Sequence, residues 1–400
     1  MALLAQEIFL TDLPQGSSTS VPSQALPPPK FFAQTDHPRW MRRCIELASL
    51  AAGQTAPNPM VGCVILKEGI VVGEGFHPGA GQPHAEVFAL DQAQDKAKGA
   101  TLYVNLEPCN HTGRTPPCTE AIVRSGIRQV VVGMVDPDPR VSGTGIQRLR
   151  QADLEVEVGV EEAACQRLNE AFVQRVTYHR PLGLLKYAMT LDGKIASTSG
   201  HSAWVTGPLA RAAVHRLRAT CDAVVVGGNT VRRDNPQLTS HGHSSHNPLR
   251  VVMSRRLDLP VQANLWHTEA APTVVFTTTD ADPAQQQILR SQGVEVVALP
   301  LLTPGLVTEH LYQRGCAAVL WECGGRLAAE AIKDGVIDKL WAFVAPKLVG
   351  GEAAPGPVGD LGIEHMGQAL ALERTTWSTL GDDLLLEAYL RFPGLNRAAV

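Results

Sequence analysis

One histidine and two cysteines in this chain have the types and order of a catalytic zinc site. His84 stands in the run Pro-His-Ala-Glu, and Cys109 and Cys118 follow it. This ligand set holds zinc and leaves a fourth position for water, which ionises near neutral pH when it is bound. Glu86 is not a ligand and is free to take the proton and pass it to a departing amine. The segment therefore predicts a hydrolytic deaminase that attacks an amidine-like ring carbon.

The spacing of the two cysteines is unusual for such a site. The second cysteine normally follows the first after two residues, whereas residues 110–117 separate them here. We expect one helix from His84 to about Ala97 and another from Thr119 to Ser125, opened by Cys118. Helix N-termini favour thiolate over thiol, because their unpaired N–H groups carry partial positive charge. Two helices that begin side by side can thus present all three ligands to one ion.

The elements around these residues alternate between helix and strand. Apolar residues at three- and four-residue steps predict a helix over residues 40–52, which Gly53 closes. Short apolar runs predict four strands, at residues 61–66, 70–74, 101–105 and 129–133. His77 lies in a loop close in sequence to the zinc segment, where substrate contact is the less favoured interpretation.

A second α/β unit is expected to start near Arg180. Its predicted elements include a strand over 182–189 and a helix over 208–219. Further strands are predicted at 223–227, 250–253, 273–277, 294–299, 317–322 and 340–345. Two of them end in glycine pairs followed by a helix, which suits a nucleotide phosphate, although such pairs alone are more often tight turns. Neither pair fits G-x-G-x-x-G, which argues against a standard Rossmann fingerprint.

Length and composition indicate a soluble enzyme of two domains. The 400 residues exceed one ordinary core, and the net charge of −4 gives no basic field for nucleic acid. No apolar run approaches the roughly 18 residues that span a bilayer. Eight cysteines scattered along a chain without a secretory signal suggest reduced thiols in the cytoplasm. Residues 1–36 are rich in proline and poor in apolar residues, so we expect a disordered extension.

With these residues in view, the chain resembles the bifunctional deaminase–reductases of riboflavin biosynthesis. The motifs that carry the resemblance are residues 56–62, 84–86, 106–118, 186–193, 234–239 and 321–325. The resemblance implies an α/β protein with a cytidine-deaminase-like domain over 37–178 and a dihydrofolate-reductase-like domain over 181–394. It also implies two reactions on a pyrimidine ribosyl 5′-phosphate: loss of the 2-amino group at zinc, then reduction of the ribosyl side chain to ribityl by NADPH.

The resemblance also implies the residues of the reductase site. The NADPH site would be lined by Ala188, Trp204, Thr230, Asp234, Ser254, Gly324, Gly325, Arg326, Leu327, Ala328, Ala329 and Glu330. The substrate would be contacted by Ser202, Arg218, Leu238, His241 and Glu322. His241 departs from the pattern, because an arginine is usual there, and histidine pairs with phosphate only when it is protonated. Either phosphate affinity at this position would be weaker, or Arg218 and Arg255 would compensate for the lost guanidinium.

Two alternatives remain at this point. A nucleic-acid or free-nucleoside deaminase would share the zinc chemistry but leaves half the chain unexplained. A protein that only binds pyrimidine phosphates would need a lost ligand or a lost Glu86. The histidine-rich tract 241–246 could suggest a metal site, but its serine, glycine and asparagine context favours a loop. We expect a cytoplasmic homo-oligomer that contacts small-molecule substrates and neither nucleic acid nor membrane.

Overall fold

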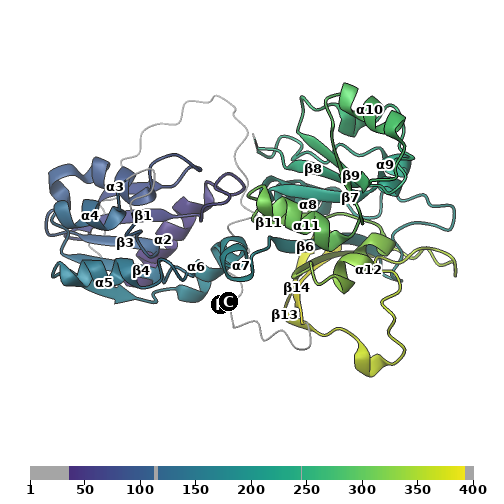
Figure 1. Cartoon of the computed structure of the whole chain (residues 1–400). Helices are drawn as coiled ribbons and strands as arrows, with labels where there is room; N and C mark the ends of the chain where they lie inside the picture. The colour runs from purple at the N-terminus through teal and green to yellow at the C-terminus, as the bar shows by residue number, and fades with distance from the viewer. Residues whose placement is uncertain (1–35, 112–115, 245, 392–400) are drawn as a thin grey trace, which may run out of the picture. The chain divides into compact units, whose positions relative to one another are not determined.

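The computed structural model describes residues 36–111, 116–244 and 246–391. The chain divides into two compact units: residues up to Ala51 with Met60–Leu168, and Ala52–Pro59 with Asn169 onwards (Figure 1). The extension predicted over residues 1–36 lies outside the described residues except for Asp36. The Asp36 carboxylate caps the first described helix by accepting a hydrogen bond from the Arg39 N–H, at 3.3 Å.

A five-stranded sheet forms the centre of the first unit in the described part of the chain. Its strands are β1 (Gly62–Lys67), β2 (Ile70–Phe76), β3 (Thr101–Leu106), β4 (Gln129–Met134) and β5 (Glu155–Val158). The order across the sheet is β2-β1-β3-β4-β5, with β1 antiparallel to both neighbours and β3, β4 and β5 parallel. The helices are α2 (His37–Ser49), α3 (Ala85–Ala93), α4 (Cys118–Arg124), α5 (Thr144–Gln151) and α6 (Glu162–Leu168), with the 3-10 turn η1 (Gln94–Ala97).

Small residues bring α3 unusually close to this sheet. A Cβ atom on Gly73 would lie 2.1 Å from the carbonyl oxygen of Ala89, and one on Gly75 would lie 2.5 Å from that of Ala85. On the helix side, Ala85, Ala89 and Ala93 are buried in the same hydrophobic cluster as Cys63 of β1. Because neither surface carries bulk, the two backbones touch, and this contact fixes where α3 begins.

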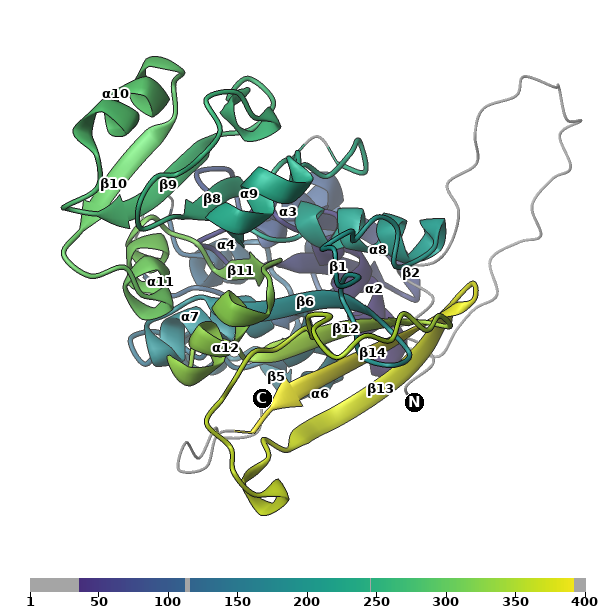
Figure 2. The same cartoon turned by 90° about the vertical axis from the view of Figure 1, so that its right-hand side faces the viewer.

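A nine-stranded sheet forms the second unit in the part of the chain that the structure describes. Its strands are β6 (Leu182–Thr190), β7 (Ala223–Gly227), β8 (Leu249–Met253), β9 (Thr273–Thr278), β10 (Glu295–Leu299), β11 (Ala318–Trp321), β12 (Lys339–Ala345), β13 (Leu372–Leu380) and β14 (Asp383–Leu390). The order is β10-β9-β8-β7-β11-β6-β12-β14-β13. The strands from β10 to β12 are parallel, and β14 and β13 add an antiparallel hairpin, visible at one edge in Figure 2.

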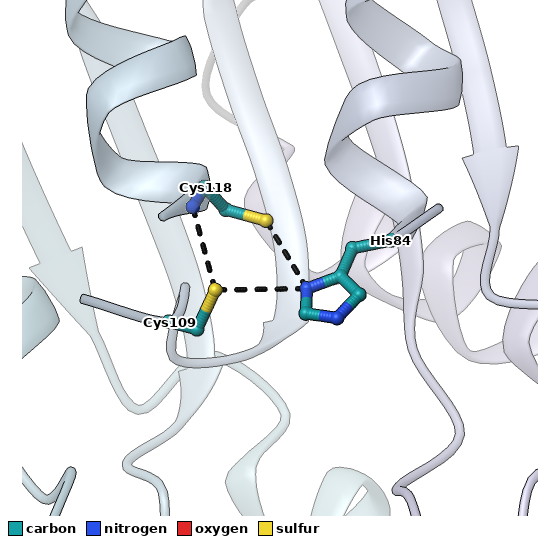
Figure 3. Close-up of side chains that lie close together, drawn as sticks. All are labelled: His84, Cys109 and Cys118. Carbon is teal, nitrogen blue, oxygen red and sulfur yellow. Dashed lines mark hydrogen bonds between the residues drawn. The ribbon is translucent and has the colours of Figure 1, made fainter. Parts of the chain in front are cut away.

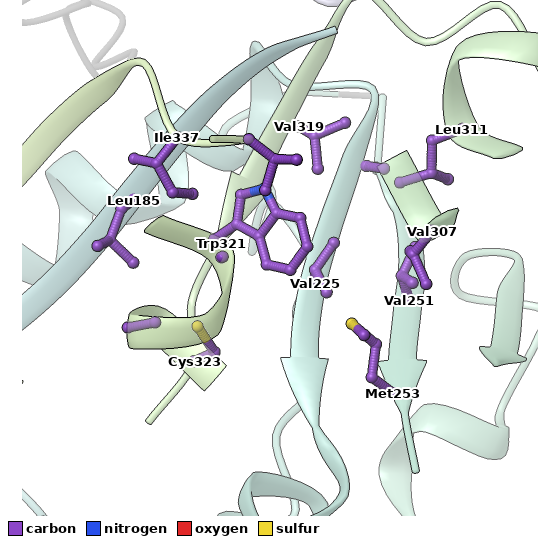
Figure 4. Close-up of a cluster of buried hydrophobic side chains, with 14 of the residues drawn as sticks. Leu185, Val225, Val251, Met253, Val307, Leu311, Val319, Trp321, Cys323 and Ile337 are labelled. Carbon is purple, nitrogen blue, oxygen red and sulfur yellow. The ribbon is translucent and has the colours of Figure 1, made fainter. Parts of the chain in front are cut away.

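Helices α7 (Glu170–Tyr178), α8 (Pro208–Ala219), α9 (Gly228–Asp234), α10 (Pro283–Ser291), α11 (Pro304–Gln313) and α12 (Gly325–Lys333) belong to this second unit, with short turns η2 (Asn264–Trp266) and η3 (Met366–Gln368). Successive strand residues point to opposite faces, so the parallel strands are apolar on both. Val225 and the fully buried Trp321 pack in one cluster with Leu311 (Figure 4). Val224 and Val226 pack in another with Leu217 of α8.

Most of the predicted elements are present, with shifted ends. The helix predicted over 40–52 is α2 and begins at His37, because Asp36 caps it and Pro38 suits its first turn. The helix predicted from His84 to about Ala97 is wrong only over its end: Gln94 has a φ of 48°, so α3 ends at Ala93 and residues 94–97 form the 3-10 turn η1. The helices α5, α6, α7, α10 and α11, the strand β5 and the hairpin β13–β14 correspond to no prediction.

Candidate active sites

The structure brings together the three residues predicted to bind zinc (Figure 3). The His84 Nδ1 atom lies 3.2 Å from the Cys118 Sγ and 3.6 Å from the Cys109 Sγ. Among the described residues, these are the one group of histidine, cysteine and acidic side chains placed to hold a metal, with ligand atoms within 4.8 Å of one another. Ligands of tetrahedral zinc at about 2.0–2.3 Å from the ion are roughly 3.5 Å apart, so the spacing fits zinc.

Helix starts position two of the three ligands. His84 has extended backbone angles and is the N-cap residue of α3. Cys118 is the first residue of α4, and its N–H donates to the Cys109 Sγ at 3.3 Å. Cys109 itself lies in the turn after β3. Because α3 touches β2 through Gly73 and Gly75, its N-terminus cannot move away from that turn without opening the core.

A buried carboxylate anchors the turn that carries Cys109. Glu107 accepts four backbone hydrogen bonds of 2.8–3.1 Å, from Asp136, Gly143, Gly145 and Ile146. These N–H groups belong to the loop before α5 and to the first turn of that helix. A Cβ atom on Gly145 would lie 2.1 Å from the Pro108 carbonyl oxygen, so α5 packs directly on the turn. Sequence reasoning missed Glu107, although its place two residues before Cys109 was a usable signal.

Two further polar side chains hold segments of the first unit: His77 contacts the His84 segment, and Asn105 contacts the start of β1. His77 is buried, and its Nδ1–H donates to the Pro83 carbonyl oxygen at 3.0 Å. Its ring meets the His84 ring edge to face, with 5.4 Å between centroids. The fully buried Asn105 accepts from the Gly62 N–H at 2.7 Å and donates to the Met60 carbonyl at 3.0 Å. His77 therefore orients a candidate ligand, whereas Asn105 fixes the start of β1.

Glu86 has the environment of a proton carrier. Its side chain is only 3% exposed, and burial, assisted by the charge of Cys109, raises the pKa of Glu86 to about 7. The Oε2 atom is buried and has no hydrogen-bond partner. A lone carboxylate oxygen in an apolar site is costly unless a ligand satisfies it. The donor set of two sulfurs and one nitrogen, with this unsatisfied oxygen beside it, fits a zinc ion and a water molecule.

In the second unit, the carboxyl ends of adjacent parallel strands form the other candidate site. Helix α9 follows β7 with Gly227 as its N-cap, and α12 follows β11 with Gly324 as its N-cap. Because β7 and β11 are neighbours, the two helix N-termini lie at the same edge, where α/β sheets bind nucleotides. A Cβ atom on Gly228 would lie 3.0 Å from the Ser254 Oγ, so Ser254 is at this edge too.

The residues implied for NADPH occupy several elements around that edge. Thr230 and Asp234 are on α9, Ala188 is near the end of β6, and residues 324–330 run from the N-cap of α12 into the helix. Trp204 is 71% exposed, with the Arg211 guanidinium over its ring at 4.6 Å. Ala328 and Ala329 are buried within α12.

A buried charge cluster lies among the residues implied for substrate. The Arg218 guanidinium donates two hydrogen bonds to the Glu322 carboxylate, at 2.5 and 3.1 Å, and the Lys186 Nζ lies 3.6 Å from it. Burial acts to raise the pKa of Glu322, but the charges of Arg218 and Lys186 outweigh it and lower that pKa to about 2. For the ammonium group of Lys186, burial has the opposite effect and lowers the pKa. The sequence indicated Lys186 only as part of a motif. In the structure it pairs with Glu322 inside the buried charge cluster.

The other three residues that the resemblance implies for substrate binding lie in different surroundings. Ser202 donates a hydrogen bond to the Asp234 carboxylate at 3.3 Å, which joins a substrate candidate to a cofactor candidate. Leu238 is buried in the hydrophobic cluster that contains Val224 and Val226. His241 is exposed in the loop after α9, and its ring stacks on that of His215.

Comparisons with known proteins agree with this arrangement of two sites. Residues 34–134 match the cytidine and deoxycytidylate deaminase zinc-binding region, and residues 181–386 match the RibD C-terminal domain. The riboflavin biosynthesis protein RibD of Synechocystis sp. is 61% identical over 350 residues, which are 88% of this chain and 95% of the relative. The chain belongs to the RibD family. Its fold class is thereby confirmed: a cytidine-deaminase-like domain followed by the reductase domain of RibD.

Other members of the RibD family extend the likeness. RibD of Aquifex aeolicus is 43% identical over 87% of this chain and 96% of its own. A crystal form of Acinetobacter baumannii RibD has a TM-score of 0.80 and 39% identity, and covers 89% of this chain and 99% of its own. The protein is therefore a bifunctional deaminase and reductase of riboflavin biosynthesis that uses zinc and NADPH. Within the described residues, no helix is long and apolar enough to cross a membrane.

The ligand assignment predicts the metal content of two variants. Wild-type protein should bind about one zinc per chain, as a single open site requires. Cys118→Ala should lose most of that zinc, whereas Cys63→Ala, a buried cysteine of β1 outside the triad, should keep it. Metal analysis after dialysis measures both. Full zinc content in Cys118→Ala would refute the assignment.

The anchoring role of Glu107 predicts a loss of stability together with a loss of zinc affinity. Glu107→Ala leaves several buried N–H groups unpaired, which should cost at least ~2 kcal/mol in the free energy of unfolding. Because the Cys109 turn loosens, zinc affinity should fall about 10- to 100-fold, as for other supporting residues. Denaturant unfolding and competition with a zinc-binding dye measure the two effects. Glu120→Ala, which removes a surface pair with Arg148, is the control, and equal effects in both variants would contradict the role.

Proposed function

We propose that the first reaction is hydrolytic deamination of 2,5-diamino-6-ribosylamino-4(3H)-pyrimidinone 5′-phosphate. A structural relative from Thermotoga maritima, 37% identical with a TM-score of 0.78, is described as a diaminohydroxyphosphoribosylaminopyrimidine deaminase and 5-amino-6-(5-phosphoribosylamino)uracil reductase. The observation that carries the proposal is the clustering of His84, Cys109 and Cys118 beside the buried Glu86.

In this proposal, His84, Cys109 and Cys118 hold the zinc ion. When bound, zinc lowers the pKa of a coordinated water and so supplies a nucleophile at neutral pH. Glu86 accepts the proton that this water releases, because its raised pKa lets it hold a proton, and a pKa of about 7 is close enough to neutral pH for it to pass the proton to the departing 2-amino group. Ammonia then leaves and the ring carbon keeps an oxygen. The unsatisfied Oε2 is the atom that we assign to the proton transfers.

We propose that the second reaction reduces the ribosyl side chain of the deaminated product. NADPH would be held by the residues named above from Ala188 to Glu330, which include the N-termini of α9 and α12. When bound, it would supply a hydride to the anomeric carbon, with cleavage of the bond between that carbon and the ring oxygen. The ring oxygen needs a proton, and Lys186, whose pKa burial lowers, is suited to give it. Glu322 and Arg218 would hold Lys186 and the sugar in place.

We further propose domain limits and a cellular setting. The functional domains would be residues 37–178 and 181–394, although α7, at the end of the first range, folds with the second unit. Arg175 of α7 donates to the carbonyls of Tyr312 and Cys316, so α7 packs on the second unit. A cytoplasmic homo-oligomer acting on small molecules remains our proposal for the working state. All eight cysteines are free thiols, which suits a reducing compartment, although relatives in Arabidopsis and maize are named chloroplastic.

The proton-carrier role predicts a selective loss of deamination. Glu86→Gln keeps the shape of the side chain but cannot accept a proton, so ammonia release should fall at least ~100-fold. Zinc content and NADPH oxidation with supplied deaminated substrate should stay near wild type. An ammonia assay, metal analysis and absorbance of NADPH report the three quantities. Near-normal ammonia release from zinc-loaded Glu86→Gln would reject the role.

The reciprocal variant tests the second site. Asp234→Ala removes the acceptor for Ser202 at the cofactor edge and should raise the KM for NADPH about tenfold, the usual size of a lost charge-assisted hydrogen bond. Ammonia release should be unchanged, since no described zinc candidate lies on α9. Glu373→Ala on β13, an exposed carboxylate paired with Arg391, is the control. Loss of deamination with intact reduction in a well-folded Asp234→Ala protein would reverse the assignment of the sites.

A further inference from the structure

Trp204 exposes an aromatic ring on a segment that lies just before α8. Its side chain is 71% exposed, although burial of an indole ring ordinarily contributes much to stability. An exposed aromatic ring is a candidate ligand contact if its position is fixed, and a solvated side chain without a role if it is not. The contacts of residues 204–207 decide between these two alternatives.

The ammonium group of Lys347 holds the backbone of this segment. Lys347 lies in the loop after β12, and its Nζ donates to the carbonyl oxygens of Trp204 and Val205, at 2.9 and 2.8 Å. Lysine carries three donors on one nitrogen, so a single side chain can bridge two successive carbonyls. Hydrogen bonds from a charged donor are roughly twice as strong as neutral ones. Lys347 thus fixes the two peptide units that follow the Trp204 Cα atom.

The loop that carries Lys347 is itself tied to the turn after β6. The Lys347 carbonyl oxygen accepts a hydrogen bond from the Leu191 N–H at 2.9 Å. The Asp192 carboxylate accepts one from the Gly350 N–H at 2.7 Å. Because β6 and β12 are parallel neighbours, both loops leave the same edge of the sheet. Lys347 therefore joins the segment with the exposed ring to the strand that carries Ala188, another residue of the proposed NADPH site.

Two further charged side chains hold the indole ring and the rest of the segment. The Arg211 guanidinium of α8 lies over the Trp204 ring, 4.6 Å from its centroid, and donates to the Thr206 carbonyl at 2.7 Å. The buried Asp383 carboxylate, at the start of β14, accepts from the Gly207 N–H at 2.7 Å. Arg211 covers one face of the indole ring by a cation–π contact. Since the side chain is still largely exposed, its other face is open to a planar ligand.

A ring held in this way favours binding of a planar heterocycle. Both the nicotinamide and the adenine of NADPH are planar, and offset stacking on an aromatic ring is favourable. A freely rotating indole would lose rotamer freedom when it stacks, which reduces affinity. The Trp204 ring has lost most of that freedom before any ligand binds, because its backbone and one of its faces are already held.

We propose that Lys347 and Arg211 are positioning residues of the reductase site, which hold the Trp204 ring ready to stack on a planar ring of NADPH. The inference rests on the proposed second reaction and deepens it, because it names the residues that set the affinity for the cofactor. In this role neither cation contacts the reacting atoms. Loss of either should therefore weaken NADPH binding and leave the chemical step nearly unchanged.

The kinetic test measures NADPH oxidation by full-length, zinc-loaded protein with the deaminated pyrimidine ribosyl 5′-phosphate. Lys347→Met keeps the length of the side chain but removes its donors, so the KM for NADPH should rise about tenfold with kcat within about twofold. Lys347→Arg should recover most of the affinity, because a guanidinium can also donate to both carbonyls. Arg290→Met is the matched control and should behave like wild type, because it removes a cation that donates to the Val296 carbonyl of the edge strand β10.

Fluorine NMR of protein labelled with fluorotryptophan reports the state of the ring without catalysis. The chain has six tryptophans, and the Trp204 resonance is the one missing from Trp204→Phe. NADPH should shift this resonance in wild type. In Lys347→Met and Arg211→Met the resonance should be narrower before NADPH is added, because the ring moves more freely. The resonance of Trp377, an exposed ring on β13, should be the same in all of these proteins.

The outcomes separate this inference from the proposed reaction. An unchanged KM for NADPH and an unchanged Trp204 resonance in Lys347→Met would overturn the positioning role and leave the reductase assignment intact. A loss of kcat and of melting temperature that Lys347→Arg does not restore would indicate a general structural role and would also overturn it. Normal oxidation in wild type without a shift of the Trp204 resonance would contradict stacking. Absence of NADPH oxidation in wild type would refute the second reaction, and the inference with it.

Discussion

The backbone of α3 lies against β2 with no room for a side chain at two positions, and the zinc site depends on that contact. Gly73 and Gly75 on the strand meet the carbonyls of Ala89 and Ala85 on the helix. The contact fixes His84 at the start of α3, opposite the turn in which Glu107 holds Cys109. Each anchor belongs to the packed interior, so the ligands are positioned by the core rather than by the loop between them.

In the second unit, the main constraint is the burial of charged side chains beside the α/β sheet. Lys186, Arg218 and Glu322 are largely buried together, and such a cluster contributes little net stability because desolvation offsets attraction. The cluster lies at the carboxyl edge of the sheet, next to the N-termini of α9 and α12, where α/β proteins bind their ligands. In the proposed second reaction, Glu322 and Arg218 hold Lys186 at this edge as the proton donor.

The sequence predicted the parts of both sites that depend on local chemistry. His84, Glu86, Cys109 and Cys118 could be recognised because metal ligands and proton carriers are restricted to few residue types. The helix starts at Cys118 and Pro208 followed from local signals. The partners of Glu107 lie about 30 to 40 residues away, and those of Lys186 more than 100 away, so no local pattern indicates them. The sequence did not indicate that α3 ends before Gln94, because the residue pattern does not show the positive φ that Gln94 adopts.

The central claim is that His84, Cys109 and Cys118 hold one zinc ion with an open fourth position. X-ray absorption at the zinc edge tests it most directly, on the full-length protein loaded with one zinc per chain. The account predicts two sulfur ligands at about 2.3 Å and two nitrogen or oxygen ligands at about 2.0–2.1 Å, one of them exchangeable water. A shell of four sulfurs, or one with oxygen ligands alone, would contradict it.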